Sequence, residues 1–306
     1  MTTFNLGLPT KPATQVPINW AFEQVHTLTN ELCSYFDTIN NLLTIRKSLR
    51  KYGKTPQLID LVGASFEDNG ITFSNEGIME AIAKAFKWIK DKLAELWKWF
   101  IGLFSSTKKI KENANKADKN INDKVDKAIA EGIPSIRVSI VDMPRVTQAV
   151  DEFVQLGQKF DQTETQLIAE GNPVLEVDKL RQVSDKYIQF MMDNTQGPKL
   201  LTSYSLKTLP IEDAKDLSKI CKDLVFQLSD SMEVRESRLK MVKAGIATTE
   251  TRLKKDQDHV GLQNTLEFFQ ITFKTVDMEL KFVNTIIEMA TRVQTTIDTE
   301  LSKVKA

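Results

Sequence analysis

Apolar residues recur at alternating steps of three and four positions over most of this chain. Such spacing places them along one side of an α-helix, and over many turns it forms the seam of a heptad-patterned helix. The longest seams lie within residues 211–304, where the polar stretch KKDQDHVG (254–261) separates two of them. The pattern therefore predicts an antiparallel αα-hairpin over 211–304, with helices about 60 Å long at 1.5 Å per residue.

Shorter seams of the same kind cover residues 20–49, 146–167 and about 175–194. The stretch 132–144 instead alternates between apolar and polar residues, and its prolines limit it to an edge strand or an extended connector. Glycine and proline are few, and the prolines lie in clusters or between the periodic runs. The predicted fold class is therefore all-α, an elongated bundle of long heptad-patterned helices.

Shifts in composition divide the chain into five expected segments. They are an extended Pro-rich arm at 1–18, an N-terminal helix with a short apolar connector at 19–75, an amphipathic helix at 76–105, a charged helical spacer at 106–132 and a long-helix bundle at 133–306. Ser74 or Asn75 is the expected N-cap of the amphipathic helix, because short polar side chains there accept a bond from a free backbone amide.

The amphipathic helix has a composition unlike that of any other segment. Its sequence KAFKWIKDKLAELWKWFIGLF (84–104) holds three of the four tryptophans of the chain and five lysines. On a helical wheel the apolar residues, Trp97 among them, cluster on one side, and Trp88 and Trp99 flank this apolar arc. The candidate interface residues are Ile82, Phe86, Trp88, Ile89, Leu93, Leu96, Trp97, Trp99, Phe100, Leu103 and Phe104. The lysine flank consists of Lys84, Lys87, Lys90 and Lys98.

This pattern leaves two interpretations of the helix open. A membrane span needs about 20 consecutive apolar residues, and charged residues interrupt this run, so a single span is excluded. The wide apolar face, the tryptophans and the lysines are typical of a helix that lies in a bilayer interface. The same apolar arc is also what an internal helix of a bundle requires.

Neither the charge balance nor the sequence motifs point to an active site. Lysine plus arginine and aspartate plus glutamate number 41 each, so no global field favours a charged partner. Motifs for nucleotide binding, metalloprotease or serine-hydrolase chemistry are absent from the sequence. His26 and His259 are expected at the surface, and Cys33 and Cys221 as buried reduced thiols. We therefore expect no enzyme activity, no catalytic residues, no metal site and no cofactor.

The run FSNEGIMEAIAKAFKWIKDKLAELWKWFIGLF (73–104) resembles a segment of internal virion proteins, of the core or ejection type, of large tailed bacteriophages. The resemblance implies a non-enzymatic virion structural protein inside the capsid or at the portal, ejected with the DNA and contacting the host membrane through the amphipathic helix. It implies a virion location after synthesis in the cytoplasm of the bacterial host, which agrees with the lack of a signal-peptide pattern at the start of the sequence.

The partners implied by the resemblance are other virion proteins, further copies of this chain in a homo-oligomer, a lipid bilayer, and packaged DNA contacted without sequence preference. A small-molecule substrate is not expected. Two other classes fit the same pattern: an α-helical pore-forming toxin of the cytolysin A-like kind, and a coiled-coil scaffold or assembly protein without a membrane role.

Overall fold

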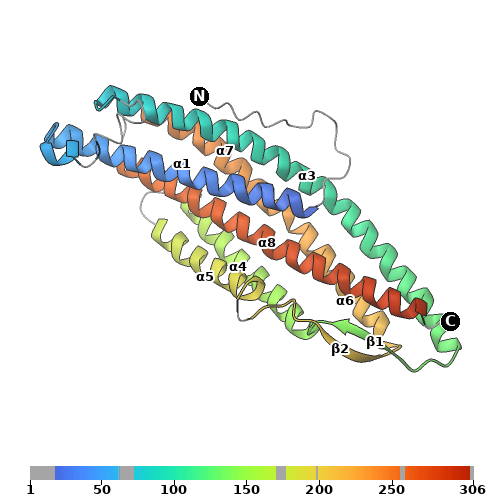
Figure 1. Ribbon diagram of the computed structural model, residues 1–306. Coiled ribbons are helices and arrows are strands. Elements are labelled where there is room, and N and C mark those ends of the chain that lie inside the picture. Colours follow the sequence, from blue (N-terminus) through green and yellow to red (C-terminus); the bar gives the residue numbers. More distant parts are fainter. Residues whose placement is uncertain are drawn as a thin grey trace.

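The computed structural model describes residues 18–60, 62, 72–169, 177–197, 199–255 and 259–303. Nearly all of the expected N-terminal arm lies outside these residues. The described elements, in chain order, are α1 (Ile18–Tyr52), α3 (Asn75–Ala130), β1 (Ser135–Ile140), α4 (Met143–Ala169), α5 (Val177–Thr195), β2 (Ser205–Pro210), α6 (Asp213–Asp230), α7 (Met232–Lys254) and α8 (His259–Lys303). The helices lie along one another in an elongated bundle with the two strands at one end, and the predicted all-α class is confirmed (Figure 1).

Helix α8 is the axis of the bundle. Helix α8 has 45 residues. In its middle part, side chains are buried around nearly the whole circumference, because other elements pack on several of its sides. Phe273 meets Phe36 of α1 with ring centroids 6.0 Å apart, and Phe282 stacks on Phe153 of α4 at 4.5 Å. A helix that is apolar on all sides is stable only when it is covered on all sides.

The first arm of the predicted hairpin is broken into two helices. Ser231 separates α6 from α7, and its hydroxyl donates a hydrogen bond to the carbonyl oxygen of Leu228 at 2.6 Å. The guanidinium of Arg235 donates to the Ser231 carbonyl oxygen, also at 2.6 Å. Side-chain bonds of this kind compete with the helical backbone pattern and mark a helix end. The expectation of one unbroken helix there was wrong, whereas α8 forms the second arm.

Helix α3 joins two segments that the sequence pattern separates. The expected amphipathic helix and the expected charged spacer form one helix of 56 residues, about 84 Å long at 1.5 Å per residue. Ser74 is the N-cap, since its hydroxyl accepts a bond from the Gly77 amide at 3.0 Å. A side chain at Gly77 would meet the Thr72 carbonyl oxygen at 2.1 Å, so only glycine fits this start.

The two strands pair in antiparallel fashion, with Ser135 opposite Pro210 and Ile140 opposite Ser205. The stretch 132–144 thus contains a strand, one of the two structures predicted for it. Its inner side chains, such as Val138, are buried against the end of the bundle, whereas β2 is mostly exposed. The sequence did not reveal β2, because its partner lies about 70 residues earlier in the chain and its outer position leaves no clear apolar alternation.

Charged substitutions inside α8 test its role as the axis. Phe273→Asp and Leu280→Asp place a carboxylate where the native side chains are 1% exposed. An unpaired buried charge and a lost apolar side chain should lower the free energy of unfolding by roughly 3–5 kcal/mol. Urea unfolding followed by circular dichroism measures this change. Thr295→Asp, at an exposed position of the same helix, is the control, and an equal effect of all three changes would contradict the assignment.

Candidate functional site: the aromatic half of α3

The aromatic half of α3, residues 78–104, turns its apolar face into the bundle. The side chains of this face are all buried, with exposures of 0 to 4%: Ile82, Phe86, Ile89, Leu93, Leu96, Phe100 and Leu103. Helix α1 packs along this half of α3, and α7 lies beside it on another side. The structure therefore brings seven of the eleven candidate interface residues together in the core.

All three tryptophans are half-buried at the margins of this face, as the helical wheel predicts for Trp88 and Trp99 but not for Trp97. Trp88 is half-buried and stacks on Tyr35 of α1, with ring centroids 3.5 Å apart. Trp97 is half-buried, and the ammonium groups of Lys240 and Lys243 on α7 lie 5.6 Å and 5.7 Å from its ring centroid. Trp99 is also half-buried and packs against the core. The side chain of Phe104 lies outside the described part of the structure.

The lysine flank points to solvent. Lys84 pairs with Glu80 on the same helix at 3.0 Å, and Lys90 pairs with Glu250 of α7 at 2.6 Å. Lys87 and Lys98 are exposed. Exposed ion pairs contribute little to stability, typically below about 1 kcal/mol, so these lysines do not hold α3 in place. The burial of its apolar face holds α3 in place.

In this conformation the apolar face serves as bundle core, which is one of the two interpretations of the sequence pattern. Contact of this face with lipid requires that α1 and α7 first uncover it, so a membrane role of the face stays a prediction. None of the described helices contains an apolar stretch of the length that crossing a bilayer demands.

A second cluster, which the sequence analysis did not identify as a site, lies where α4, α5, α7 and α8 meet. We call it the ionic network; it consists of Asp161, Glu164, Arg235, Arg238 and Glu279, with Tyr187 and Thr272 as neutral members. Arg238 donates to a carboxylate oxygen of Glu279 at 2.7 Å and also pairs with Asp161. The Arg235 Nε lies 3.2 Å from the same Glu279 oxygen. Both arginines and Glu279 are at most 4% exposed.

Aromatic rings and a glycine shape the walls of the ionic network. The guanidinium of Arg238 lies 4.7 Å from the ring centroid of Phe160, and that of Arg235 lies 5.5 Å from that of Phe153. A side chain at Gly157 would come within 2.9 Å of the Tyr187 hydroxyl. Glycine at this seam position thus admits the tyrosine, whose side chain helps to lower the pKa of Glu279.

The carboxylates of the network respond differently to the same surroundings. Burial acts to raise the pKa of Glu279, but Arg238 and Arg235 outweigh it and hold that pKa below its usual value. Burial raises the pKa of Glu164 to about 7, although Arg238 and a hydrogen bond from Thr272 oppose the shift. The pKa of Asp161 is raised by burial as well. Two guanidinium groups face three carboxyl groups, so the network favours protonation of one acid.

The signal for this network was present in the sequence. Glu164 and Arg235 occupy seam positions of their heptad patterns, where an apolar residue is the rule. Two charged seam residues of opposite sign indicate a buried pair, but their positions 71 residues apart do not identify the partners. Only the packing of α4 against α7 and α8 brings them together.

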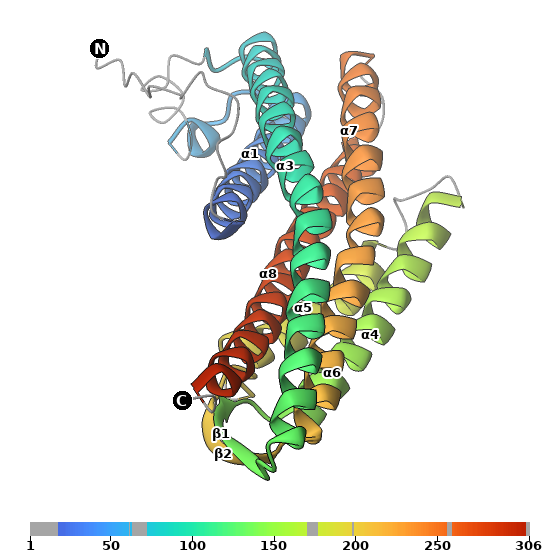
Figure 2. The same cartoon turned by 90° about the vertical axis from the view of Figure 1, so that its right-hand side faces the viewer.

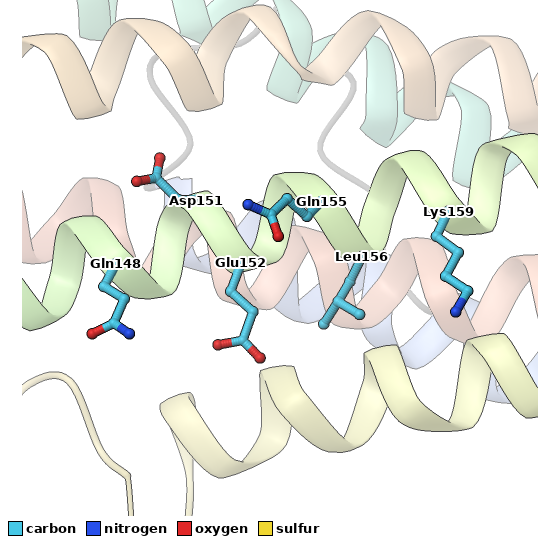
Figure 3. A pocket seen from close by; sticks show the side chains of 6 residues that line it. All are labelled: Gln148, Asp151, Glu152, Gln155, Leu156 and Lys159. Atoms are coloured by element: carbon cyan, nitrogen blue, oxygen red, sulfur yellow. The ribbon is translucent and has the colours of Figure 1, made fainter.

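The remaining candidates for chemistry do not form a site. A hollow on the surface is lined by Gln148, Asp151, Glu152, Gln155, Leu156 and Lys159, all from α4 (Figure 3). Asp151 points to one side of the helix and Gln148, Glu152 and Lys159 to the other, so their polar groups do not converge on a ligand.

The structure describes the side chains of one histidine and of both cysteines. His26 is partly exposed, and its Nδ1 lies 2.7 Å from a carboxylate oxygen of Asp277, which joins α1 to α8. The side chain of His259 lies outside the described part. Cys33 and Cys221 are buried free thiols, as predicted, and burial raises the pKa of each thiol to about 12. Such thiols are poor nucleophiles.

Comparisons of the chain with protein-family models, with curated proteins and with solved structures found no match.

The ionic network predicts that the bundle is more stable in mild acid than in mild base. The pKa of Glu164 is about 7 in the folded state and near 4.5 in the unfolded chain, so the folded state binds the extra proton between these values. The free energy of unfolding should therefore rise as the pH falls from about 8 to about 5, by on the order of 3 kcal/mol. Asp161 contributes in the same direction.

Glu164→Gln removes this ionisation and keeps the oxygen that accepts from Thr272. The variant should be more stable than the native protein at about pH 8, nearly equal to it at about pH 5, and should lose most of the slope between. Glu152→Gln, at an exposed position of α4, is the matched control. Urea unfolding at several pH values gives the profiles, and parallel curves for native protein and Glu164→Gln would exclude Glu164 as the cause.

Proposed function

We propose that this chain is a non-enzymatic structural protein of a bacteriophage virion, internal or associated with the portal. It leaves the virion with the DNA and engages the host membrane through the aromatic half of α3. The observation that carries the membrane role is the arrangement of side chains in that half. Its apolar face is buried against other helices of the same chain, tryptophans lie at both margins of the face, and lysines lie on the solvent side. Helices of this kind bind a bilayer interface once the apolar face is free.

A weak point in α3 supports the release of this half. The sequence GLFSST (102–107) separates the two halves of the helix, and glycine and serine have low helix propensity. After this stretch in the chain, α3 pairs with α6 through Asp118 with Lys222 at 2.7 Å and Asp126 with Lys215 at 2.5 Å. Before it, the aromatic half of α3 packs on α1 and α7. The two halves are thus held by different helices, and bending at 102–107 frees one without the other.

The two other candidate functions differ in how they use the same face. A scaffold or assembly protein keeps the face permanently in the core. A pore-forming toxin inserts an apolar segment through the bilayer, and such a segment is lacking among the described helices. The buried face therefore favours reversible release onto an interface over insertion across it.

The virion assignment predicts that the protein is a component of purified phage particles. Mass spectrometry of virions purified on a density gradient should detect peptides of this chain, and these peptides should resist protease added to intact particles. The same peptides should be lost from particles that have been triggered to eject. Detection only in infected-cell lysate, and never in particles, would support the scaffold or assembly function instead.

The release of α3 can be tested with a cross-link between α3 and α7. Lys90→Cys with Glu250→Cys replaces an ion pair that spans 2.6 Å, so a cleavable bismaleimide can join the two cysteines. The native thiols are buried and should not react. With anionic vesicles, the unlinked protein should show tryptophan quenching by brominated lipid chains, because the released face carries its tryptophans to the acyl boundary. The linked protein keeps this face buried and should show much weaker quenching, and cleavage of the linker should restore the full signal.

The matched control is a linker between Glu300→Cys and Lys303→Cys, a pair at 2.7 Å within α8. This linker joins no two helices, so quenching should persist. A substitution such as Phe100→Glu is less informative in the full chain, because Phe100 is 0% exposed and its loss disturbs folding. Equal quenching with and without the α3–α7 linker would exclude release, and no quenching in any state would leave α3 as a structural helix only.

A further inference from the structure

One group of apolar and basic side chains on α3 and α7 stays exposed in the closed bundle. We call it the lysine-ringed patch: Trp97 and Ile101 at its centre, with Lys98, Lys108, Lys240 and Lys243 around them. Ile101 is 50% exposed, and it lies one helical turn after Trp97, so the two side chains are neighbours on one face. An exposed isoleucine next to a half-buried tryptophan contrasts with the buried apolar face of the aromatic half of α3.

The lysines of the patch come from two helices. Lys98 and Lys108 are three positions before and seven positions after Ile101, which puts them on the same face of α3. The ammonium groups of Lys240 and Lys243 lie 5.6 Å and 5.7 Å from the Trp97 ring centroid. Lys240 pairs with Glu236 at 2.6 Å, whereas the other three form no ion pair within the described part of the chain. The patch is therefore apolar at its centre and positively charged at its rim.

This combination fits an anionic lipid surface better than a nucleic acid. An amphipathic tryptophan and an aliphatic side chain enter the headgroup region while lysines meet the phosphates. A nucleic-acid surface uses lysines too, but it gains nothing from an exposed isoleucine. Single-stranded DNA stacks its bases on open aromatic rings, and two lysines already lie over the ring of Trp97.

We propose that the lysine-ringed patch docks the closed bundle on an anionic bilayer surface before the aromatic half of α3 is released. The inference rests on the proposed function for its purpose, but docking itself needs no opening of the bundle. Few apolar atoms take part, so the contact is reversible and is weakened by salt, which screens the lysines from the lipid phosphates. Docking also places the GLFSST weak point, which directly follows Ile101, next to the bilayer.

The experiment uses the full chain locked closed by the α3–α7 linker, with vesicles of phosphatidylcholine alone or with one part in about three of phosphatidylglycerol. Vesicle flotation at low salt should recover the locked protein with the anionic vesicles and not with the neutral ones. Binding should be lost near 1 M salt, where the Debye length is about 3 Å. Equal binding to neutral vesicles, or binding that ignores salt, would overturn the proposal.

Matched variants separate the patch from the general charge of α3. Ile101→Glu should weaken flotation at least about tenfold, whereas Ile129→Glu, at an isoleucine of the same helix that is 43% exposed, should leave it unchanged. Lys98→Gln with Lys108→Gln should also weaken it at least about tenfold. Lys116→Gln with Lys119→Gln, both exposed on α3, should not. All four variants change exposed positions, and circular dichroism verifies that they fold. Equal effects within either pair would overturn the patch.

The outcomes distinguish docking from the proposed function. If the locked protein floats but the unlocked protein never shows quenching by brominated lipid, docking stands and release fails. If the unlocked protein is quenched while the locked protein does not float, release stands and the docking patch is wrong. If duplex DNA displaces the locked protein from vesicles, and DNA binding depends on Lys98 and Lys108 but not on Ile101, the patch is a nucleic-acid surface and the proposal is overturned.

Discussion

The burial of α8 on all sides is the constraint on which the rest of the bundle depends. The middle of α8 is buried around most of its circumference, so other elements cover it from several directions at once. The helices α1, α3, α5, α6 and α7 and strand β1 all pack directly on it, and α4 contacts it through Phe153 and Glu164 while packing on α5 and α6. The elongated shape follows, because covering one long helix evenly requires other helices that lie along it (Figure 2).

The ionic network follows from the same constraint. Glu279 lies on α8 at 2% exposure, and a buried carboxylate must be paired, so α7 supplies Arg235 and Arg238. Arg235 also donates a hydrogen bond to Ser231, where α6 ends. The same arginine thus contacts both Glu279 of α8 and the break between α6 and α7. Asp161 and Glu164 of α4 add two carboxyl groups, so three acids face two arginines. The bundle accepts this excess through the raised pKa of Glu164.

Competition for the apolar face of α3 is the physical basis of the proposed function. In the closed bundle this face gains the free energy of burial against its neighbours, and in a membrane it gains a similar free energy from the acyl chains. Because the two gains are alike, small contributions at the margins decide between them. Such contributions include the contacts of Trp97 with α7, the pairing of Lys90 with Glu250 and the helix propensity of residues 102–107.

The sequence by itself determined the fold class, the helical seams, the face of α3 and the burial of both thiols. Each of these depends on the spacing and type of residues that are near one another in the chain, and a helix repeats every 3.6 residues whatever surrounds it. The positions of Trp88 and Trp99 beside that face were predictable for the same reason. Tertiary structure decided whether that face meets protein in this conformation, since lipid and a bundle core select the same side chains.

Tertiary structure also decided the features that join distant parts of the chain. Strand β2 exists because β1 lies at the end of the bundle, and Glu164 meets Arg238 because α4 packs beside α7. At the break between α6 and α7, Ser231 accepts a hydrogen bond from Arg235, which also pairs with Glu279 of another helix. Periodicity is a local property, whereas pairing between residues far apart depends on which helices become neighbours, and many arrangements of the same amphipathic helices bury their seams equally well.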